Sequence, residues 1–351
     1  MSQHQPDDHA EHDHDHEGDH DHDHDHEAGL KGWLLGLLRP HEHGHYATAL
    51  DPAMSNARGI WAVKVSLIIL LFTAVFQLFI VAISGSVALL ADTIHNFSDA
   101  LTAIPLWIAF TLARRPRNDR YTYGYGRAED LAGVLIVVMI FLSALEVFQQ
   151  SIDKLLHPQP ISNLGWVAAA AIIGFIGNEA VATLRMRVGR EIGSAALMAD
   201  GLHARADGFT SLGVLVGVIG VALGFPLADP LVGLFIGAAI LIVVRNAARD
   251  MWYRLMDAVD PAVSRSIAQA AAQVPGVQAV HDVTIRWLGH RQRAELNVDV
   301  PGEWSTAQSH QVAEEVRHAL FHAQPALVEV MVHVDPAGDD QHDTTAHHRT
   351  A

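Results

Sequence analysis

Two segments of the chain carry the same pair of ionisable residues at the same spacing. His95 is followed four residues later by Asp99, and His203 is followed four residues later by Asp207. In an α-helix this spacing places both side chains on one face, about 6 Å apart along the axis. Two such helices facing each other would present two imidazoles and two carboxylates to a shared point. Four nitrogen and oxygen ligands match the tetrahedral coordination that Zn²⁺ takes in proteins.

The elements that would position these residues are long and apolar. Between residues 61 and 247 the sequence contains several stretches near the roughly 20 residues that a membrane-spanning helix needs. We expect six spanning helices, with the two His/Asp pairs in the second and the fifth. Their approximate bounds are 61–83, 86–112, 129–150, 164–186, 194–223 and 227–245.

Carboxylates inside a membrane point to a function. An aspartate at bilayer depth costs about 2.5–3.5 kcal/mol on insertion scales. Asp99 and Asp207, brought together, would also repel each other unless a cation or protons lie between them. The pattern therefore favours a site that protons occupy when metal is absent and that metal takes by displacing them. The structural alternative is two local hydrogen-bonded clusters that stabilise the helix bundle.

The absence of cysteine limits the chemistry further. Without thiolates, any metal must be held by imidazole and carboxylate groups, which suit Zn, Co, Ni, Mn or Fe better than Cu(I). The expected spanning helices contain no HExxH pair and no evident nucleophile partnered with a base, so an intramembrane metalloenzyme is disfavoured. We expect no enzymatic activity, no bound cofactor and no nucleic-acid partner.

Basic residues are unevenly distributed among the loops. Five arginines lie between 114 and 127, after the second helix, and three more follow the sixth. The link from the fourth to the fifth helix is expected to hold Arg185, Arg187 and Arg190, whereas the alternate links hold only Lys154. By the positive-inside rule the arginine-rich loops and both termini are cytoplasmic. The expected location is the cell membrane, as a multi-pass protein of the bacterial inner-membrane type in contact with lipid.

The N-terminal tail is a separate low-complexity segment. Between Met1 and Glu27 there are eleven acidic residues and no Lys or Arg, so we expect it to be disordered. Alternating imidazole and carboxylate groups could gather metal near the membrane; alternatively, any metal affinity is incidental. The candidate capture residues are His14, His16, His20, His22, His24 and His26.

After Asp260 the sequence changes to that of a small soluble domain. We expect a helix at 263–274, strands at 277–288 and 293–300, a helix from the Ser305 capping box to about His322, and a strand at 328–334. This gives an αββαβ order. The expected organisation is a disordered tail, a transmembrane domain, this domain and a second disordered tail, at residues 1–57, 58–250, 251–336 and 337–351.

Four motifs resemble the cation diffusion facilitator family. They are the runs ALLADTIHNFSD, YGYGRAE and ALMADGLHARADGFTSL, and the Ala228-Asp229-Pro230 turn, in family order and spacing. The resemblance covers about 61–336. It implies a homodimeric metal/proton antiporter that exports metal from the cytoplasm, with a ferredoxin-like, metallochaperone-shaped cytoplasmic domain.

The resemblance also implies which residues bind the transported ion. The family's central site maps onto His95, Asp99, His203 and Asp207, a set typical of zinc exporters that also carry cadmium or cobalt. Zn²⁺ is thus the expected substrate. The alternatives are a transporter of the same family specific for Co²⁺, Cd²⁺, Ni²⁺ or Fe²⁺, and a membrane sensor that binds metal without moving it.

Accessory sites depart from the family pattern. Tyr121 and Tyr125 stand where some members have metal-binding histidines, so we expect no metal site in that loop. Asn297 likewise replaces one histidine of the cytoplasmic domain, so a site there would be incomplete. The candidate accessory ligands are His281, His310, His333 and Asp335. Each could instead be a satisfied surface or core residue.

Overall fold

The structure is a computed structural model that describes residues 52–84, 93, 97, 101, 103–157, 164–225 and 227–338. His95, Asp99 and the six candidate histidines of the tail lie outside the described residues. The expected bounds of the two disordered tails fall mostly outside them as well.

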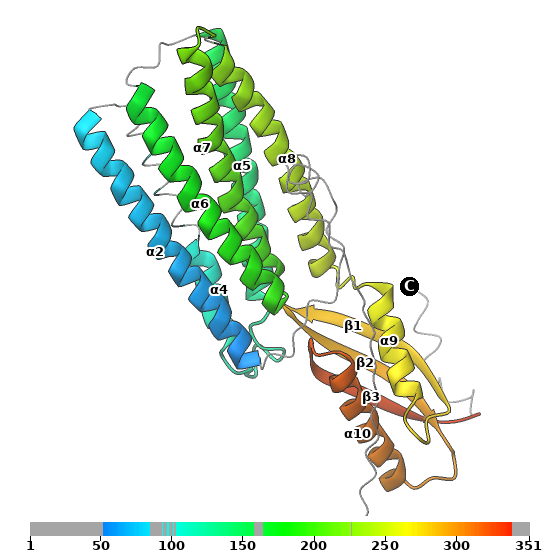
Figure 1. Cartoon of the computed structure of the whole chain (residues 1–351). Helices are drawn as coiled ribbons and strands as arrows, with labels where there is room; N and C mark the ends of the chain where they lie inside the picture. Colours follow the sequence, from blue (N-terminus) through cyan, green and yellow to red (C-terminus); the bar gives the residue numbers. More distant parts are fainter. Residues whose placement is uncertain are drawn as a thin grey trace, which may run out of the picture. The chain divides into compact units, whose positions relative to one another are not determined.

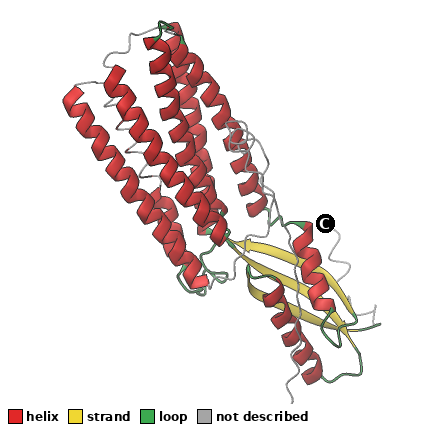
Figure 2. Ribbon diagram, viewed as in Figure 1, coloured by secondary structure: helices red, strands yellow, loops and turns green. Residues whose placement is uncertain are grey.

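Long apolar helices form the first part of the described chain (Figures 1 and 2). Among the described residues, five helices are long and apolar enough to cross a membrane. These are α2 (Pro52–Ser84), α5 (Ala128–Leu156), α6 (Leu164–Ile192), α7 (Ala195–Ala222) and α8 (Ala228–Leu255). The shorter apolar helix α4 (Ala103–Ala113) lies within the second expected span. The expectation of a six-helix membrane part is confirmed at this level.

Four helices extend further than the sequence pattern predicted. Helix α2 begins at Pro52 rather than near residue 61, and α5 continues to Leu156 rather than ending near residue 150. Helix α6 continues to Ile192 and α8 to Leu255, rather than ending near residues 186 and 245. Our placement of Arg185 in a loop was therefore wrong. Its side chain is 1% exposed inside the bundle and pairs with Asp200 on α7. A buried arginine with a buried partner carries no information about which side of the membrane a loop occupies.

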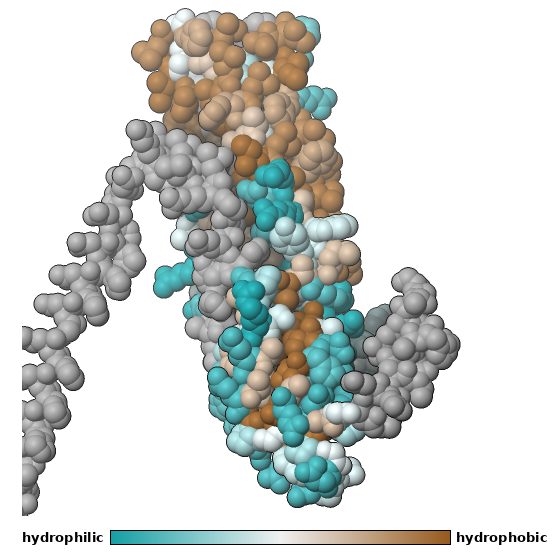
Figure 3. Space-filling view, turned by 90° about the vertical axis from the view of Figure 1, so that its right-hand side faces the viewer, coloured by the Kyte–Doolittle hydropathy of each residue, from teal (hydrophilic) through white to brown (hydrophobic). Residues whose placement is uncertain are grey.

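Apolar side chains cover much of the outer surface of the helices. On α2, Ile68, Phe72 and Phe79 are more than 60% exposed. Figure 3 shows apolar residues gathered over the helical part and a larger share of polar residues over the rest. Such a surface is stable in hydrocarbon and not in water. The chain is a multi-pass membrane protein.

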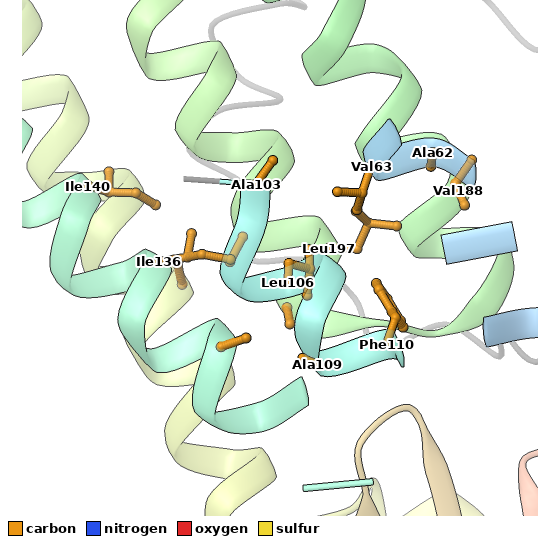
Figure 4. Packing of buried hydrophobic residues seen from close by; sticks show 14 of the residues in the cluster. Ala62, Val63, Ala103, Leu106, Ala109, Phe110, Ile136, Ile140, Val188 and Leu197 are labelled. Atoms are coloured by element: carbon orange, nitrogen blue, oxygen red, sulfur yellow. The ribbon is translucent and has the colours of Figure 1, made fainter. Parts of the chain in front are cut away.

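The interior of the bundle is built by close packing of small and branched side chains. Leu106 and Phe110 of α4 pack with Ile136 of α5 and Leu197 of α7 in one buried cluster (Figure 4). Helices α7 and α8 approach closely at Gly217, where an added methyl group would lie 2.8 Å from the Cα of Asp229. Small residues at such crossings allow dispersion contacts between backbones.

The C-terminal domain has the expected αββαβ order. It consists of α9 (Pro261–Ala272), β1 (Ala279–Leu288), β2 (Arg291–Val300), α10 (Thr306–Ala323) and β3 (Leu327–Pro336). Strand β2 lies in the centre, antiparallel to β1 and parallel to β3. Its side chains alternate between buried and half-buried, as the sequence alternation predicted. The Ser305–Gln308 capping box that starts α10 is also confirmed.

Candidate metal-transport site

The described half of the expected transport site lies on α7. His203 and Asp207 are 1% and 5% exposed. The Nδ1 atom of His203 lies 3.7 Å from Oδ2 of Asp207, so the two side chains share a helix face as the spacing predicted. An imidazole and a carboxylate are thus buried side by side within a helix long and apolar enough to span a membrane.

The other ionisable groups of this motif are paired with α6. Asp200 lies 3.0 Å from the guanidinium of Arg185, and both side chains are fully buried. Arg205 donates from Nε to Glu179 at 3.2 Å. These ion pairs join α6 to α7 and balance the remaining charges. The Asp207 carboxylate lies beside the imidazole of His203, and its charged neighbours on α7, Asp200 and Arg205, pair with Arg185 and Glu179.

Helix α4 contacts α7, and the two helices share one buried cluster. Ala103 and Leu106 of α4 belong to the same buried cluster as Leu197 and Ala206 of α7. Ala206 lies immediately before Asp207 in the sequence. Ala103 lies four positions after Asp99, so the chain segment that follows the first His/Asp pair contacts the helix that carries the second.

A second group of metal-ligand side chains lies on the sheet of the C-terminal domain. His281 Nε2 lies 3.0 Å from Asp299 and 3.8 Å from Asp335. His333 Nε2 lies 3.1 Å from Asp335. Among the described residues, one ligand atom from each of His281, Asp299 and Asp335 falls within 4.8 Å of the other two. We call these three residues with His333 the sheet cluster.

The register of the sheet explains which predicted residues meet. Asn297 on β2 pairs with His281 on β1 and with His333 on β3, so the asparagine stands between the two imidazoles. Asp299, which sequence reasoning did not select, follows two residues later on the same face. The polar alternation of β2 was the signal that could have identified it. His310 is exposed on α10 and is not part of the cluster.

The carboxylates of the cluster favour the charged form of His281. Its hydrogen bond to Asp299, and a weaker one to Asp282, raise the pKa of His281 above its ordinary value of about 6.5. A metal ion binding there must displace that proton.

A buried carboxylate in the first turn of α5 joins three parts of the chain. Glu129 is 2% exposed, and its Oε2 lies 2.7 Å from Nδ1 of His290 in the β1–β2 turn. Its Oε1 accepts a hydrogen bond from the hydroxyl of Ser194. Ser194 in turn caps α7 by accepting from the amide of Leu197 at 3.1 Å. One carboxylate thus links the start of α5, the start of α7 and the C-terminal domain.

Two arginines reinforce the same contact. Arg254 donates to the carbonyls of Gly289 at 3.0 Å and Gly193 at 2.7 Å, and it stacks on the ring of Trp287. Arg127 binds both oxygens of Asp257, at 2.8 and 2.9 Å. Sequence reasoning missed these roles. The YGYGRAE run, which includes Arg127 and Glu129, was the available signal.

A cavity of about 720 Å³ lies beside this contact. Helix α7 contributes Met198 and Leu202, and α8 contributes Arg249 and Tyr253. Because Leu202 directly precedes His203, the cavity reaches the part of α7 where the His/Asp pair begins.

The loop after α4 places two of its tyrosines against each other. The rings of Tyr121 and Tyr125 lie 4.6 Å apart, and the hydroxyl of Tyr125 accepts from the amide of Asn118. Phenol groups are poor metal ligands at neutral pH because they stay protonated.

Comparison with known families decides the class of this membrane protein. Residues 63–256 match the cation efflux transmembrane domain, and residues 259–337 match the cytoplasmic domain of cation efflux proteins. The chain belongs to the cation diffusion facilitator (cation efflux) family. As a member of this family it is a cation efflux transporter and not an enzyme.

Proteins similar to this facilitator carry several different names. It is 54% identical over 309 residues to a "probable cation efflux system protein" of Mycobacterium tuberculosis, covering 88% of this chain and 93% of that protein. It is 28% identical to "cation-efflux pump FieF" of Serratia proteamaculans, over 72% of this chain and 84% of that protein. It is 26% identical to "magnetosome protein MamB" of Paramagnetospirillum magneticum, over 79% and 93%. A solved "MamM-CTD" structure matches at 28% identity, and the match covers 21% of this chain and 95% of that chain with a TM-score of 0.21.

Proposed function

We propose that this facilitator exports Zn²⁺ from the cytoplasm in exchange for protons, at a site formed by His95, Asp99, His203 and Asp207. The observation that carries the proposal is the buried His203–Asp207 pair within the membrane helix α7. Two charged neighbours on this helix, Asp200 and Arg205, pair with Arg185 and Glu179 on α6, and we assign the carboxylate of Asp207 to the transported cation.

The ligand chemistry supports zinc. Two ligands of a tetrahedral Zn²⁺ at about 2.0–2.1 Å lie roughly 3.3 Å from each other. The 3.7 Å separation of His203 Nδ1 and Asp207 Oδ2 needs only a small side-chain rotation to reach that value. Co²⁺, Cd²⁺, Ni²⁺ and Fe²⁺ accept the same ligands, so a site specific for one of them is the alternative.

Proton exchange follows from the cost of buried charge. Ionising a carboxylate as deeply buried as Asp207 is costly, and proton uptake by the His/Asp groups lowers that cost when metal leaves. Metal entering the site expels the protons. We assign the C-terminal domain, with both termini, to the cytoplasm, and we assign the cavity that Leu202 lines to the approach of metal toward α7 from that side.

Assembly and accessory binding complete the proposal. The matched cytoplasmic-domain family is a dimerisation domain, which supports a homodimer. The sheet cluster offers one imidazole and two carboxylates within reach of one ion, and His333 beside them. We assign it a regulatory metal site, and we assign the histidine-rich tail a role in gathering metal.

Flux in reconstituted vesicles tests the transport site. Asp207→Asn keeps the side-chain shape and removes the charge, so zinc flux should fall at least a hundredfold. Asp153→Asn, at an exposed carboxylate of α5, is the matched control and should leave flux unchanged. Unchanged flux in Asp207→Asn would refute the site.

Two further arms separate the alternatives. Flux that does not respond to an imposed pH gradient would refute antiport, and competition among Zn²⁺, Co²⁺, Cd²⁺, Ni²⁺ and Fe²⁺ identifies the preferred ion. Stoichiometric binding without flux would instead indicate a membrane sensor.

A further inference from the structure

Helix α10 carries a histidine pair that neither the transport site nor the sheet cluster uses. His318 and His322 are both exposed and are separated by four residues. Their Nε2 atoms lie 3.1 Å apart, and the rings meet edge to face with centroids 4.5 Å apart. The two ring nitrogens therefore already converge on one point in the solvent-facing layer of the helix.

The helix beneath the pair is firmly held. Its first turn is closed by the Ser305–Gln308 capping box. Val312, Val316 and Leu320 are buried in the core of the C-terminal domain and fix the helix against the sheet. The Cα positions of the two histidines are thus set in advance, and a ligand that joins the rings need order only their side chains.

The separation of the nitrogens suits a metal ion. Two nitrogens bound at about 2.05 Å lie roughly 2.9 Å apart at an octahedral angle of 90° and roughly 3.3 Å apart at a tetrahedral angle. The observed 3.1 Å falls between these values, so either geometry needs shifts of only a few tenths of an ångström.

The electrostatic setting also favours a cation. His322 lies in the last turn of α10, where the unpaired carbonyls give the helix end a partial negative charge. The nearest cationic neighbour in sequence, Arg317, is paired with Glu314 one turn back. Neither feature requires a metal, but both reduce the repulsion that a divalent ion would meet there.

We propose that His318 and His322 form a two-imidazole chelate for a borderline divalent ion such as Zn²⁺, Ni²⁺, Co²⁺ or Cu²⁺. Water completes the coordination sphere. In the metal-free pair one ring donates its Nε2 proton to the other. On binding, that proton moves to Nδ1 of the same ring, so both rings bind as neutral imidazoles through Nε2 and no net proton is released.

The chelate is distinct from the sheet cluster in position and in chemistry. It contains no carboxylate and lies on a helix, so it selects for imidazole-binding ions and against Mg²⁺ and Ca²⁺. A bound ion also links successive turns at the end of α10, which stabilises that end of the helix. The inference does not depend on which ion the membrane site transports.

A residue-level footprint on the full-length protein in detergent tests the chelate despite the many other histidines. Diethyl pyrocarbonate modifies accessible imidazoles, and peptide mass spectrometry reports each histidine separately. Zn²⁺ alone is the probe, with Mg²⁺ as the comparison. We expect Zn²⁺ to slow modification of His318 and His322 at least threefold, with one shared midpoint, and Mg²⁺ to have no effect.

Single variants distinguish a chelate from two independent histidines. In His322→Ala the protection of His318 should be lost, and in His318→Ala the protection of His322 should be lost. His310→Ala, on the same helix, is the matched control and should leave both protected. Absence of zinc protection in the unaltered protein, or protection of one histidine that survives loss of the other, would overturn the proposal.

Discussion

The buried pair on α7 and the sheet cluster combine similar ligands in opposite surroundings. The side chains of His203 and Asp207 lie inside a membrane helix and are at most 7% exposed, whereas the side chain of His281 in the cluster is 44% exposed. In the bundle the charge on a carboxylate must be balanced by a partner, a proton or a metal. On the sheet surface water performs much of that balancing. In the function proposed above, metal binding at the buried pair would drive exchange, whereas metal binding at the sheet cluster would only adjust a domain that is already stable.

The difference between the buried pair and the sheet cluster is tested most directly by neutralising one carboxylate in each of them. Asp207→Asn should reduce zinc flux at least a hundredfold, and Asp299→Asn should reduce it less than threefold. Transport assays in vesicles with equal amounts of folded protein measure both. Equal effects of the two substitutions would show that burial does not separate the two groups in function.

The next largest effect concerns the ion pair behind α7. Arg185→Ala leaves Asp200 as a buried charge without its arginine, which should cost about 3–5 kcal/mol of stability. Joint replacement by Arg185→Met and Asp200→Leu should recover most of that loss, because no buried charge remains. Thermal unfolding in detergent is the measurement. A double variant as unstable as the single one would contradict the pairing.

A smaller effect is expected at the contact between the bundle and the C-terminal domain. Glu129→Ala removes the acceptor for His290 and Ser194, and leaving those buried donors unsatisfied should cost about 1–3 kcal/mol. Glu129→Gln keeps one acceptor oxygen and should lose less. Glu146→Gln, at an exposed glutamate of the same helix, should change the melting temperature by no more than the error of measurement.

The smallest expected effect is a pH dependence of stability that arises at the sheet cluster. Because the folded-state pKa of His281 is raised, its charged form adds stability that is fully present below the unfolded pKa of about 6.5 and lost as pH rises through the folded pKa. His281→Asn should therefore destabilise the metal-free protein more at pH 6 than at pH 8. Water screens this exposed group, so the difference should stay below about 0.5 kcal/mol. Thermal unfolding in detergent at both pH values is the measurement, and equal destabilisation at pH 6 and pH 8 would contradict the raised pKa of His281.

The sequence predicted the elements well because their signals are strong. Long apolar runs identify spanning helices, and an ionisable pair inside one of them is conspicuous since hydrocarbon penalises it. The same reasoning predicted that His203 and Asp207 share a helix face, which the structure confirms. The αββαβ order followed from the alternation along β2 and the capping box of α10.

Long-range partners were not predictable in the same way. Asp299 is one of several polar residues on an outward strand face, and only the register with β3 places it near Asp335. The pairing of Arg185 with Asp200 was missed because no feature of the sequence around Arg185 indicates a partner on α7. The role of Glu129 depends on its contact with His290 in the β1–β2 turn, and the sequence around Glu129 does not indicate that distant partner.

That last separation has a consequence for biosynthesis. Glu129 and His290 are 161 positions apart. At a synthesis rate of 5–20 residues per second, the histidine leaves the ribosome roughly 10–30 s after the glutamate. During that interval the start of α5 must keep its carboxylate in water at the membrane surface, because its imidazole partner has not yet been made. The N-terminal starts of α5 and α7 can therefore reach their final arrangement only after translation has passed the β1–β2 turn. The C-terminal domain thus completes the folding of the helices that were inserted before it.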